Sequence, residues 1–357
     1  MEYPMFDGRH RFRSSKRLLI SLVFLAGCST LHVPVSSSSS STYTVVDTGL
    51  EQSTLYGPGV LGAWLDNDRL LVNALQDAPG AQEKWRLRLV VFDTRTQETT
   101  EIAKDVHLNC FHPESRTAVL VEGQSNVPNF KDRLSRFVTL DQGGRFLPAV
   151  VRPDMNEFCV DNGKQDRGRL QHFLRPGDGY IDLGRTGGGY STEPAILYRR
   201  NEKPVTLPIV GGELESVRYV RHLDLYQVGV GKYRMTDKHI YKFLTRDGKV
   251  VNAPRPYEAI ESVHKPSVTV SDAGGVAYAV SEYVLRDGII VLNTGGWKKN
   301  PGMFFIRNGG VTSIDASNGY LVERLLPSPD GCKLAYLYFK NYDFNTKKVV
   351  KIANFCR

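Results

Sequence analysis

The sequence lacks the signature motifs of several large enzyme classes. It contains no G-x-S-x-G nucleophile elbow, no H-E-x-x-H zinc motif, no G-x-x-x-x-G-K-[ST] phosphate loop and no strand-linked G-x-G-x-x-G. No cluster of residues indicates a particular reaction or a bound cofactor. The sequence therefore predicts a protein that is not an enzyme and that holds no cofactor.

Cysteine is scarce, with five residues in a chain of 357. None of them forms a C-x-x-C pair or a closely spaced set with histidine, which is the spacing that structural zinc sites use. A zinc site is the weaker interpretation of these cysteines, and we expect no bound metal.

Long apolar runs are also missing, because no stretch after residue 27 reaches the roughly 18 continuous apolar residues of a membrane-spanning helix. The run from Leu18 to Ala26 is too short to span a bilayer stably and follows five basic residues, Arg9, Arg11, Arg13, Lys16 and Arg17. This pattern is typical of a secretory signal peptide, here residues 1–27.

The end of that segment, Leu25-Ala26-Gly27-Cys28, resembles the lipobox of bacterial lipoproteins. The resemblance implies that Cys28 is acylated, with palmitate among its chains, and becomes the first residue of the mature protein. Ser29 stands where an Asp would signal inner-membrane retention. This implies a protein anchored by lipid to the outer membrane and facing the periplasm. The alternative is a signal peptide without lipidation, in which Cys28 is incidental.

Charge says little about partners once the signal peptide is removed. Residues 1–27 hold five of the 46 basic and two of the 38 acidic residues, so the formal net charge falls from +8 to +5. A mild excess on an exported protein does not indicate nucleic-acid binding. Residues 28–41 hold Cys28 and a serine-rich stretch, which predicts a flexible tether.

Residues 42–357 have the texture of an all-β domain. Short runs of Val, Leu, Ile, Tyr and Phe alternate with turns of Gly, Asp, Asn and Pro, and no segment shows a long helical period. Ser328-Pro329-Asp330-Gly331-Cys332-Lys333-Leu334-Ala335-Tyr336 resembles the turn-and-strand signature of TolB-type β-propellers. In that family the turn joins the innermost strand of a blade to the second strand.

Weaker versions of this unit recur along the chain, with inner turns expected near residues 67, 114, 164, 222, 273 and 330. This spacing predicts a β-propeller of six four-stranded blades, with seven blades or a pair of β-sandwiches as alternatives. The last unit lacks a fourth strand. Residues 42–47 have strand composition and no blade of their own, so we expect this N-terminal strand to close the last blade.

The predicted strand register also indicates which cysteines could form disulfides. Cys332 and Cys356 are equally distant from a hairpin midpoint near Phe344, so they should face each other across two strands. Cys110 and Cys159 fall at equivalent inner-strand positions of adjacent blades and are further disulfide candidates. The alternative is four buried free thiols.

The long connections of the predicted blades all join the second strand to the third, which places them on one face of a propeller. We expect that face to bind a partner, because aromatic and arginine side chains supply most interface energy. The candidate residues are Phe130, Lys131, Arg175, Arg185, Tyr190, Tyr233, Trp297 and Lys298. The glycine-rich stretch at 187–189 is interpreted as a hairpin loop, with an anion-binding turn as the alternative.

The sequence thus predicts a periplasmic, protein-binding propeller that serves as a scaffold or adaptor of an envelope assembly. Its partners are the membrane, through Cys28, and a periplasmic or outer-membrane protein. One alternative is an immunity or inhibitor lipoprotein that neutralises a toxic envelope-targeted enzyme. Another is a glycan-binding or glycan-cleaving propeller, which needs carboxylates or aromatic residues converging in the channel.

Overall fold

The structure, a computed structural model, describes most of the chain from residue 42 to residue 356. The described ranges are 42–52, 61–77, 85–122, 135–141, 144–150, 165–166, 169–185, 192–211, 214–230, 240–254, 280–293, 302–308, 310–314, 322–339 and 348–356. All of them belong to one unit, Ser37–Arg357.

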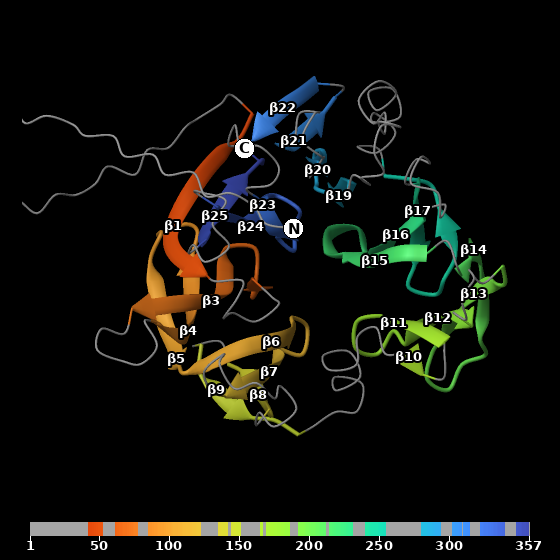
Figure 1. Ribbon diagram of the computed structural model, residues 1–357, viewed down its shortest axis with the longest axis horizontal. Coiled ribbons are helices and arrows are strands. Elements are labelled where there is room, and N and C mark those ends of the chain that lie inside the picture. Colours follow the sequence, from red (N-terminus) through yellow and green to blue (C-terminus); the bar gives the residue numbers. More distant parts are fainter. Residues whose placement is uncertain are drawn as a thin grey trace, which may run out of the picture. The chain divides into compact units, whose positions relative to one another are not determined.

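These residues form a β-propeller of six antiparallel sheets, which are numbered here in chain order (Figure 1). Sheet 1 contains β2 (Gly62–Trp64), β3 (Arg69–Asp77), β4 (Trp85–Asp93) and β5 (Thr99–Lys104). Sheet 2 contains β6 (Val106–His112), β7 (Thr117–Glu122), β8 (Ser135–Leu140) and β9 (Phe146–Pro148). Sheet 3 contains β10 (Gln165–Asp166), β11 (Arg169–Phe173), β12 (Tyr180–Arg185), β13 (Pro194–Tyr198) and β14 (Val205–Val210).

The second half of the chain repeats this arrangement. Sheet 4 contains β15 (Leu214–Val220), β16 (Leu225–Val230), β17 (Ile240–Thr245) and β18 (Val250–Val251). The 3-10 turn η3 (Arg221–Leu223) joins β15 to β16. Sheet 5 contains β19 (Val280–Val284), β20 (Ile289–Asn293), β21 (Gly302–Arg307) and β22 (Gly310–Ile314). Sheet 6 contains β23 (Val322–Pro327), β24 (Lys333–Tyr338), β25 (Lys348–Asn354) and β1 (Thr44–Gln52).

The tight turns after the first strands are built by short polar side chains. In sheet 6, Asp330 Oδ1 accepts hydrogen bonds from Ser328 Oγ at 2.6 Å and from the Cys332 N–H at 3.0 Å, and Gly331 takes a φ of 71°. In sheet 1, Asp66 Oδ1 accepts from the backbone of Asp68 and Arg69. These aspartates therefore form turns, as their recurrence in the sequence predicts.

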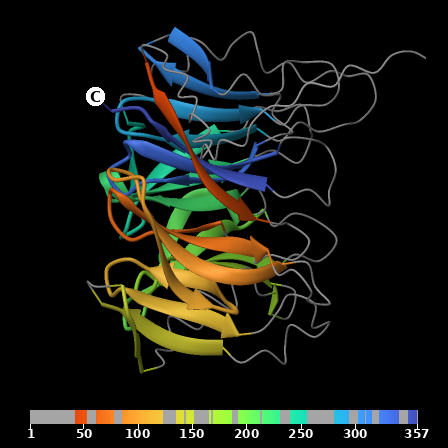
Figure 2. The same ribbon diagram turned by 90° about the vertical axis from the view of Figure 1, so that its left-hand side faces the viewer.

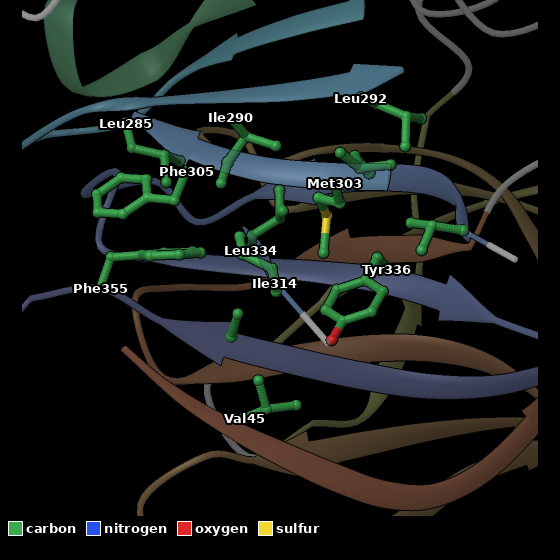
Figure 3. Close-up of a cluster of buried hydrophobic side chains, with 13 residues drawn as sticks. Val45, Leu285, Ile290, Leu292, Met303, Phe305, Ile314, Leu334, Tyr336 and Phe355 are labelled. Carbon is green, nitrogen blue, oxygen red and sulfur yellow. The ribbon is translucent and has the colours of Figure 1, made fainter. Parts of the chain in front are cut away.

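Neighbouring sheets bury their faces against each other. Shared apolar clusters join sheet 1 to sheet 2, sheet 3 to sheet 4, sheet 4 to sheet 5, sheet 5 to sheet 6, and sheet 6 to sheet 1. Figure 3 shows the cluster between sheets 5 and 6, which includes Met303 and Tyr336. The ring centres of Phe305 and Phe355 in this cluster lie 4.5 Å apart. Each such buried side chain stabilises the fold by roughly 1.5–3 kcal/mol.

The N-terminal strand completes the C-terminal sheet, as the sequence predicts. Strand β1 pairs antiparallel with β25, with Thr44 opposite Asn354 and Gln52 opposite Lys348. It lies against the blue strands of sheet 6 in Figure 2. The pairing covers the edge that β25 would otherwise present to solvent, and Val45 joins the core between sheets 5 and 6.

The predicted register holds for four inner turns and is wrong for two. The turns near 67, 114, 222 and 330 do join the first strand of a sheet to the second. In sheet 3 the corresponding turn, at 174–179, joins the second strand, β11, to the third, β12, and in sheet 5 the turn between the first two strands covers 285–288. The expected positions near 164 and 273 lie outside the described residues. Both were placed too early, because the turn-forming residues at 161–164 and 271–275 were interpreted as the inner turns.

Cysteine pairing follows the predicted hairpin. Cys332 and Cys356 form a disulfide with their Cα atoms 5.0 Å apart. Cys110 is disulfide-bonded as well, whereas Cys159, the partner proposed for it, lies outside the described residues. The thiols of Cys110, Cys332 and Cys356 are therefore not available as zinc ligands.

Among the described residues there is no α-helix. Accordingly, no helix in this part of the chain is long and apolar enough to cross a membrane.

The disulfide should stabilise the last sheet through the unfolded state, because it closes a loop with a sequence separation of 24 residues. Replacing both partners, Cys332→Ala with Cys356→Ala, should lower the free energy of unfolding by about 3 kcal/mol. Urea denaturation of the two proteins measures this difference. Alkylation of Cys332 or Cys356 in the denatured, unreduced wild-type protein would contradict the pairing itself.

Candidate functional site

The first strands of the sheets line one cavity of about 490 Å³, which we call the inner pocket. Every sheet contributes to it. Its lining includes Ala63 of β2, Phe111 of β6, Arg175 after β11, Val220 of β15, Val284 of β19 and Leu326 of β23. A recess of this volume is typical of sites that hold small ligands.

Much of the pocket wall is apolar. Leu108, Val220, Val284 and Leu325 are buried and contribute hydrocarbon surface. The Trp64 indole N–H donates to the Leu326 carbonyl at 2.9 Å, which fixes the ring and joins sheet 1 to sheet 6. The polar groups of the pocket are therefore set against an apolar background that strengthens their electrostatic interactions.

Charged side chains in the lining are mostly arginines. Among the lining residues that the structure describes, the charged ones are Glu114 and three arginines, Arg175, Arg218 and Arg221. Arg175 is 8% exposed and ion-pairs with Glu114 of the neighbouring sheet. The lining thus carries an excess of positive charge that Glu114 does not balance.

Two of the arginines are arranged differently from Arg175. Arg218 donates from Nη1 to the Glu282 carbonyl at 2.7 Å, and its guanidinium lies 3.7 Å from the centre of the Tyr283 ring. Arg221 follows β15 in η3, and its Nη1 is buried without a hydrogen-bond partner in the part of the chain that the structure describes. Arg221 therefore adds a positive charge to the lining, with one nitrogen that no described residue hydrogen-bonds.

The imidazole of His222 also lines the pocket. Burial lowers the pKa of His222, against a hydrogen bond to the Leu285 carbonyl that raises it. The ring is therefore neutral at pH 7, and its Nε2 has no hydrogen-bond partner among the described residues.

His112 belongs to a local polar set in the turn after β6. Its Nδ1 lies 2.8 Å from Ser115 Oγ, and its Nε2 lies 3.9 Å from Glu114 Oε2. The pattern has the residue types of a nucleophile, a base and a carboxylate. However, Ser115 Oγ donates to Thr117 Oγ1 at 3.0 Å and the Ser115 N–H also approaches Nδ1, a geometry that caps the turn.

A buried carboxylate holds the rim of the pocket in place. Asp178 is 3% exposed and accepts hydrogen bonds from Arg175 Nε and Tyr226 Oη, each at 2.7 Å, and from Arg246 Nη2 at 2.5 Å. Burial raises the pKa of Asp178, but the hydrogen bonds from Arg246, Tyr226 and Arg175 outweigh it and keep the pKa below its usual value. Through Arg175 and Glu114 this network ties sheets 2, 3 and 4 together.

Most of the residues predicted for the binding face lie outside the described residues. Arg175 is the exception, and its predicted place is wrong: it lies in the short turn between β11 and β12, not in the long connection after β12. Arg185 ends β12, where the backbone alone is described. The remaining six, and the segment with Cys28, lie outside the described residues: Phe130, Lys131, Tyr190, Tyr233, Trp297 and Lys298.

Sequence reasoning missed Arg218, Arg221 and Glu114 as pocket residues. Glu114 and Arg221 occupy the turn between the first and second strands, and Arg218 lies near the end of a first strand. The inner turns near 114 and 222 were placed correctly, so the residues beside these turns could have been predicted as candidates for the pocket. As for metals, the described residues contain no group of three or more His, Cys, Asp or Glu side chains that could hold an ion.

No protein-family model matches the chain, and no curated protein matches it. Solved structures with some likeness include oligogalacturonate lyase from Vibrio parahaemolyticus, at 9% identity and a TM-score of 0.37, covering 89% of this chain and 95% of that one. The β-propeller domain of the Trilobed protease from Pyrococcus furiosus has 11% identity and a TM-score of 0.30, covering 80% of each chain. Puromycin hydrolase has 13% identity and a TM-score of 0.31, covering 76% of this chain and 40% of that one.

These structures correct one expectation. The missing motifs led to the prediction that the protein is not an enzyme. That prediction is wrong, because oligogalacturonate lyase and puromycin hydrolase, both named as enzymes, are among the similar structures. At such identities and TM-scores the likeness assigns no activity to this chain.

The Asp178 network should be a large contributor to stability. Asp178→Asn leaves the buried Arg175 with a weakened partner, so the free energy of unfolding should fall by about 3 kcal/mol at pH 7. The control is Asp287→Asn, whose partner Arg307 lies 3.6 Å away on the surface and whose loss should cost less than about 1 kcal/mol. Urea denaturation measures both, and equal losses would contradict the role of Asp178.

The lowered pKa of Asp178 predicts that its contribution to stability depends on pH. Because the pKa of Asp178 is lowered in the folded state, its contribution is complete above the unfolded-state pKa of about 3.9 and is lost as pH falls through the lower folded-state value. The difference between wild type and Asp178→Asn should therefore shrink below about pH 4. A difference that grows on acidification would contradict this assignment.

Proposed function

We propose that the protein is an outer-membrane lipoprotein that faces the periplasm and uses its β-propeller to bind a partner protein in an envelope assembly. The Leu25–Cys28 stretch supports the anchor, and the serine-rich residues 29–41 supply the tether. The disulfide between Cys332 and Cys356 supports an oxidising compartment such as the periplasm, since such bonds are rare in the cytosol.

The observation that carries the binding role is the inner pocket. Every sheet contributes side chains to one recess, whose rim turns are held by the buried Asp178 network. A recognition site supported by rigid elements needs little ordering when a partner arrives, which favours affinity. The partner is expected to insert a protruding segment there rather than to lie flat, because the cavity of about 490 Å³ is recessed.

The residues that line the inner pocket disfavour the glycan-cleaving alternative but not the inhibitor alternative. Most glycoside hydrolases use a pair of carboxylates, and among the lining residues that the structure describes Glu114 is the one carboxylate, already paired with Arg175. The glycan-cleaving alternative thus lacks the feature that it needs in this pocket. The inhibitor alternative differs from the scaffold in the identity of the partner, and the capture experiment below separates them.

The anchor is tested by two substitutions near the processing site. Cys28→Ala should abolish incorporation of labelled palmitate and release the protein from membranes on fractionation. Ser29→Asp should keep the label and move the protein from the outer-membrane to the inner-membrane fraction. Membrane association of Cys28→Ala without label would contradict the lipid anchor.

The partner is tested by crosslinking in native envelopes, followed by purification of the mature lipidated protein and identification of what is captured. We expect a defined set of periplasmic or outer-membrane proteins that also binds the purified protein directly. Asp178→Asn, which loosens the rim, should reduce capture, while Asp287→Asn should not. Capture of a secreted hydrolase would favour the inhibitor alternative, and absence of any protein would contradict a protein-binding role.

A further inference from the structure

The inner pocket contains positive charge that the described protein leaves without a counter-ion. Glu114 and Asp178 together neutralise Arg175. Arg218 bonds a backbone carbonyl, and Arg221 Nη1 is buried with no hydrogen-bond partner among the described residues. Arg218 and Arg221 both line the pocket, so an anionic oxygen of a ligand would supply the opposite charge that the described lining lacks.

The surroundings of these arginines restrict the rest of the ligand. Val220 and Val284 are buried apolar neighbours in the lining, and Leu325 adds further hydrocarbon surface. A strongly hydrated, multiply charged anion would lose its water against this wall without recovering equivalent hydrogen bonds. An anion with an apolar body would instead bury hydrocarbon while its charged end meets the guanidinium groups.

The aromatic rings of the lining argue against a sugar as that body. Tyr219 has the Arg175 guanidinium 4.2 Å from its ring centre, and Tyr283 has that of Arg218 at 3.7 Å. One face of each ring is thus used within the protein and serves to hold the arginine flat. Planar, fixed guanidinium groups are suited to bidentate pairing with a carboxylate.

We propose that the inner pocket is a carboxylate-binding site, with Arg221 and Arg218 as the anion-binding residues, for an organic acid with an apolar body. The carboxylate has two sources with the same chemistry, a free small acid or an acidic side chain flanked by apolar ones in a partner segment. In the second case the site would be the point at which the proposed partner inserts. The first case stands without the proposed function.

The test uses isothermal titration of the purified wild-type protein with two matched pairs of probes. One pair is 3-phenylpropionate and its uncharged amide, and the other is the capped tripeptide Leu-Glu-Leu and its Leu-Gln-Leu counterpart. We expect one of the two acids to bind at least tenfold more tightly than its uncharged counterpart. Tighter binding by phenylpropionate identifies a small-acid site, and tighter binding by Leu-Glu-Leu identifies a site for a partner segment.

Variants then assign the binding to the named residues. Arg221→Gln should weaken the acid at least tenfold, whereas Arg221→Lys, which retains the charge and loses the planar fork, should give an intermediate loss. The control is Arg307→Gln, which removes an exposed arginine paired with Asp287 outside the pocket and should leave binding unchanged. Thermal unfolding of each variant confirms that the fold is intact, and Arg221→Lys serves if Arg221→Gln does not fold.

The proposal is overturned if neither acid binds at millimolar concentration, if each amide binds as well as its acid, or if Arg221→Gln and Arg221→Lys both bind as wild type does. Because the titration contains no partner protein, its failure is distinguishable from failure of the proposed function. Partner capture that persists when no acid binds would leave the scaffold role in place and remove the carboxylate site.

Discussion

The propeller depends on one constraint, which is that each sheet must bury both of its faces. A sheet that is apolar on both faces must bury each of them against another element, so its apolar side chains need a sheet on either side. The structure meets this need with shared clusters such as the one that joins Leu337 and Val350 of sheet 6 to Val72 and Val90 of sheet 1. Strand β1 meets the same need, because it covers β25 and places Val45 in one apolar cluster and Leu50 in another. The two ends of the domain are thereby held in one sheet.

Polar contacts add to apolar packing at some junctions. Between sheets 2 and 3 the described residues form the ion pair of Glu114 with Arg175, and Asp178 extends it to Tyr226 and Arg246 of sheet 4. Buried charges of this kind are costly unless each is fully paired. Here the same carboxylate satisfies three donors, so the turn that carries Arg175 has little freedom. Stability and the shape of the pocket rim therefore rest on the same side chains.

The sequence was informative where a local chemical signal coincided with the repeat. The turn around Asp330 specified its own structure, since its Ser, Asp and Gly residues form the bonds that the pattern requires, and it placed Cys332 opposite Cys356. In sheets 3 and 5, turn-forming residues occur earlier in the chain than the observed turns, so the pattern indicated the wrong positions. The error at sheet 3 then placed Arg175 in the wrong connection. The inner turns near 114 and 222 were predicted, but the pocket was not, because sheet packing brings Glu114 to Arg218 and Arg221 from a distant part of the sequence.

The inner pocket is assembled from several sheets rather than from one contiguous motif. A propeller builds a site by bringing one or two side chains from the inner strand of each sheet to a shared recess, so no contiguous segment needs to hold the site. Here the recess receives arginines from β15 and the turns after β11 and β15, and a single carboxylate from the turn after β6. Arg175 is held by its pairing with Glu114 and Asp178, whereas Arg218 and Arg221 form no ion pair among the described residues. The arginines of the lining are therefore divided between one that the Asp178 network uses to hold the rim and two whose positive charge stays in the lining.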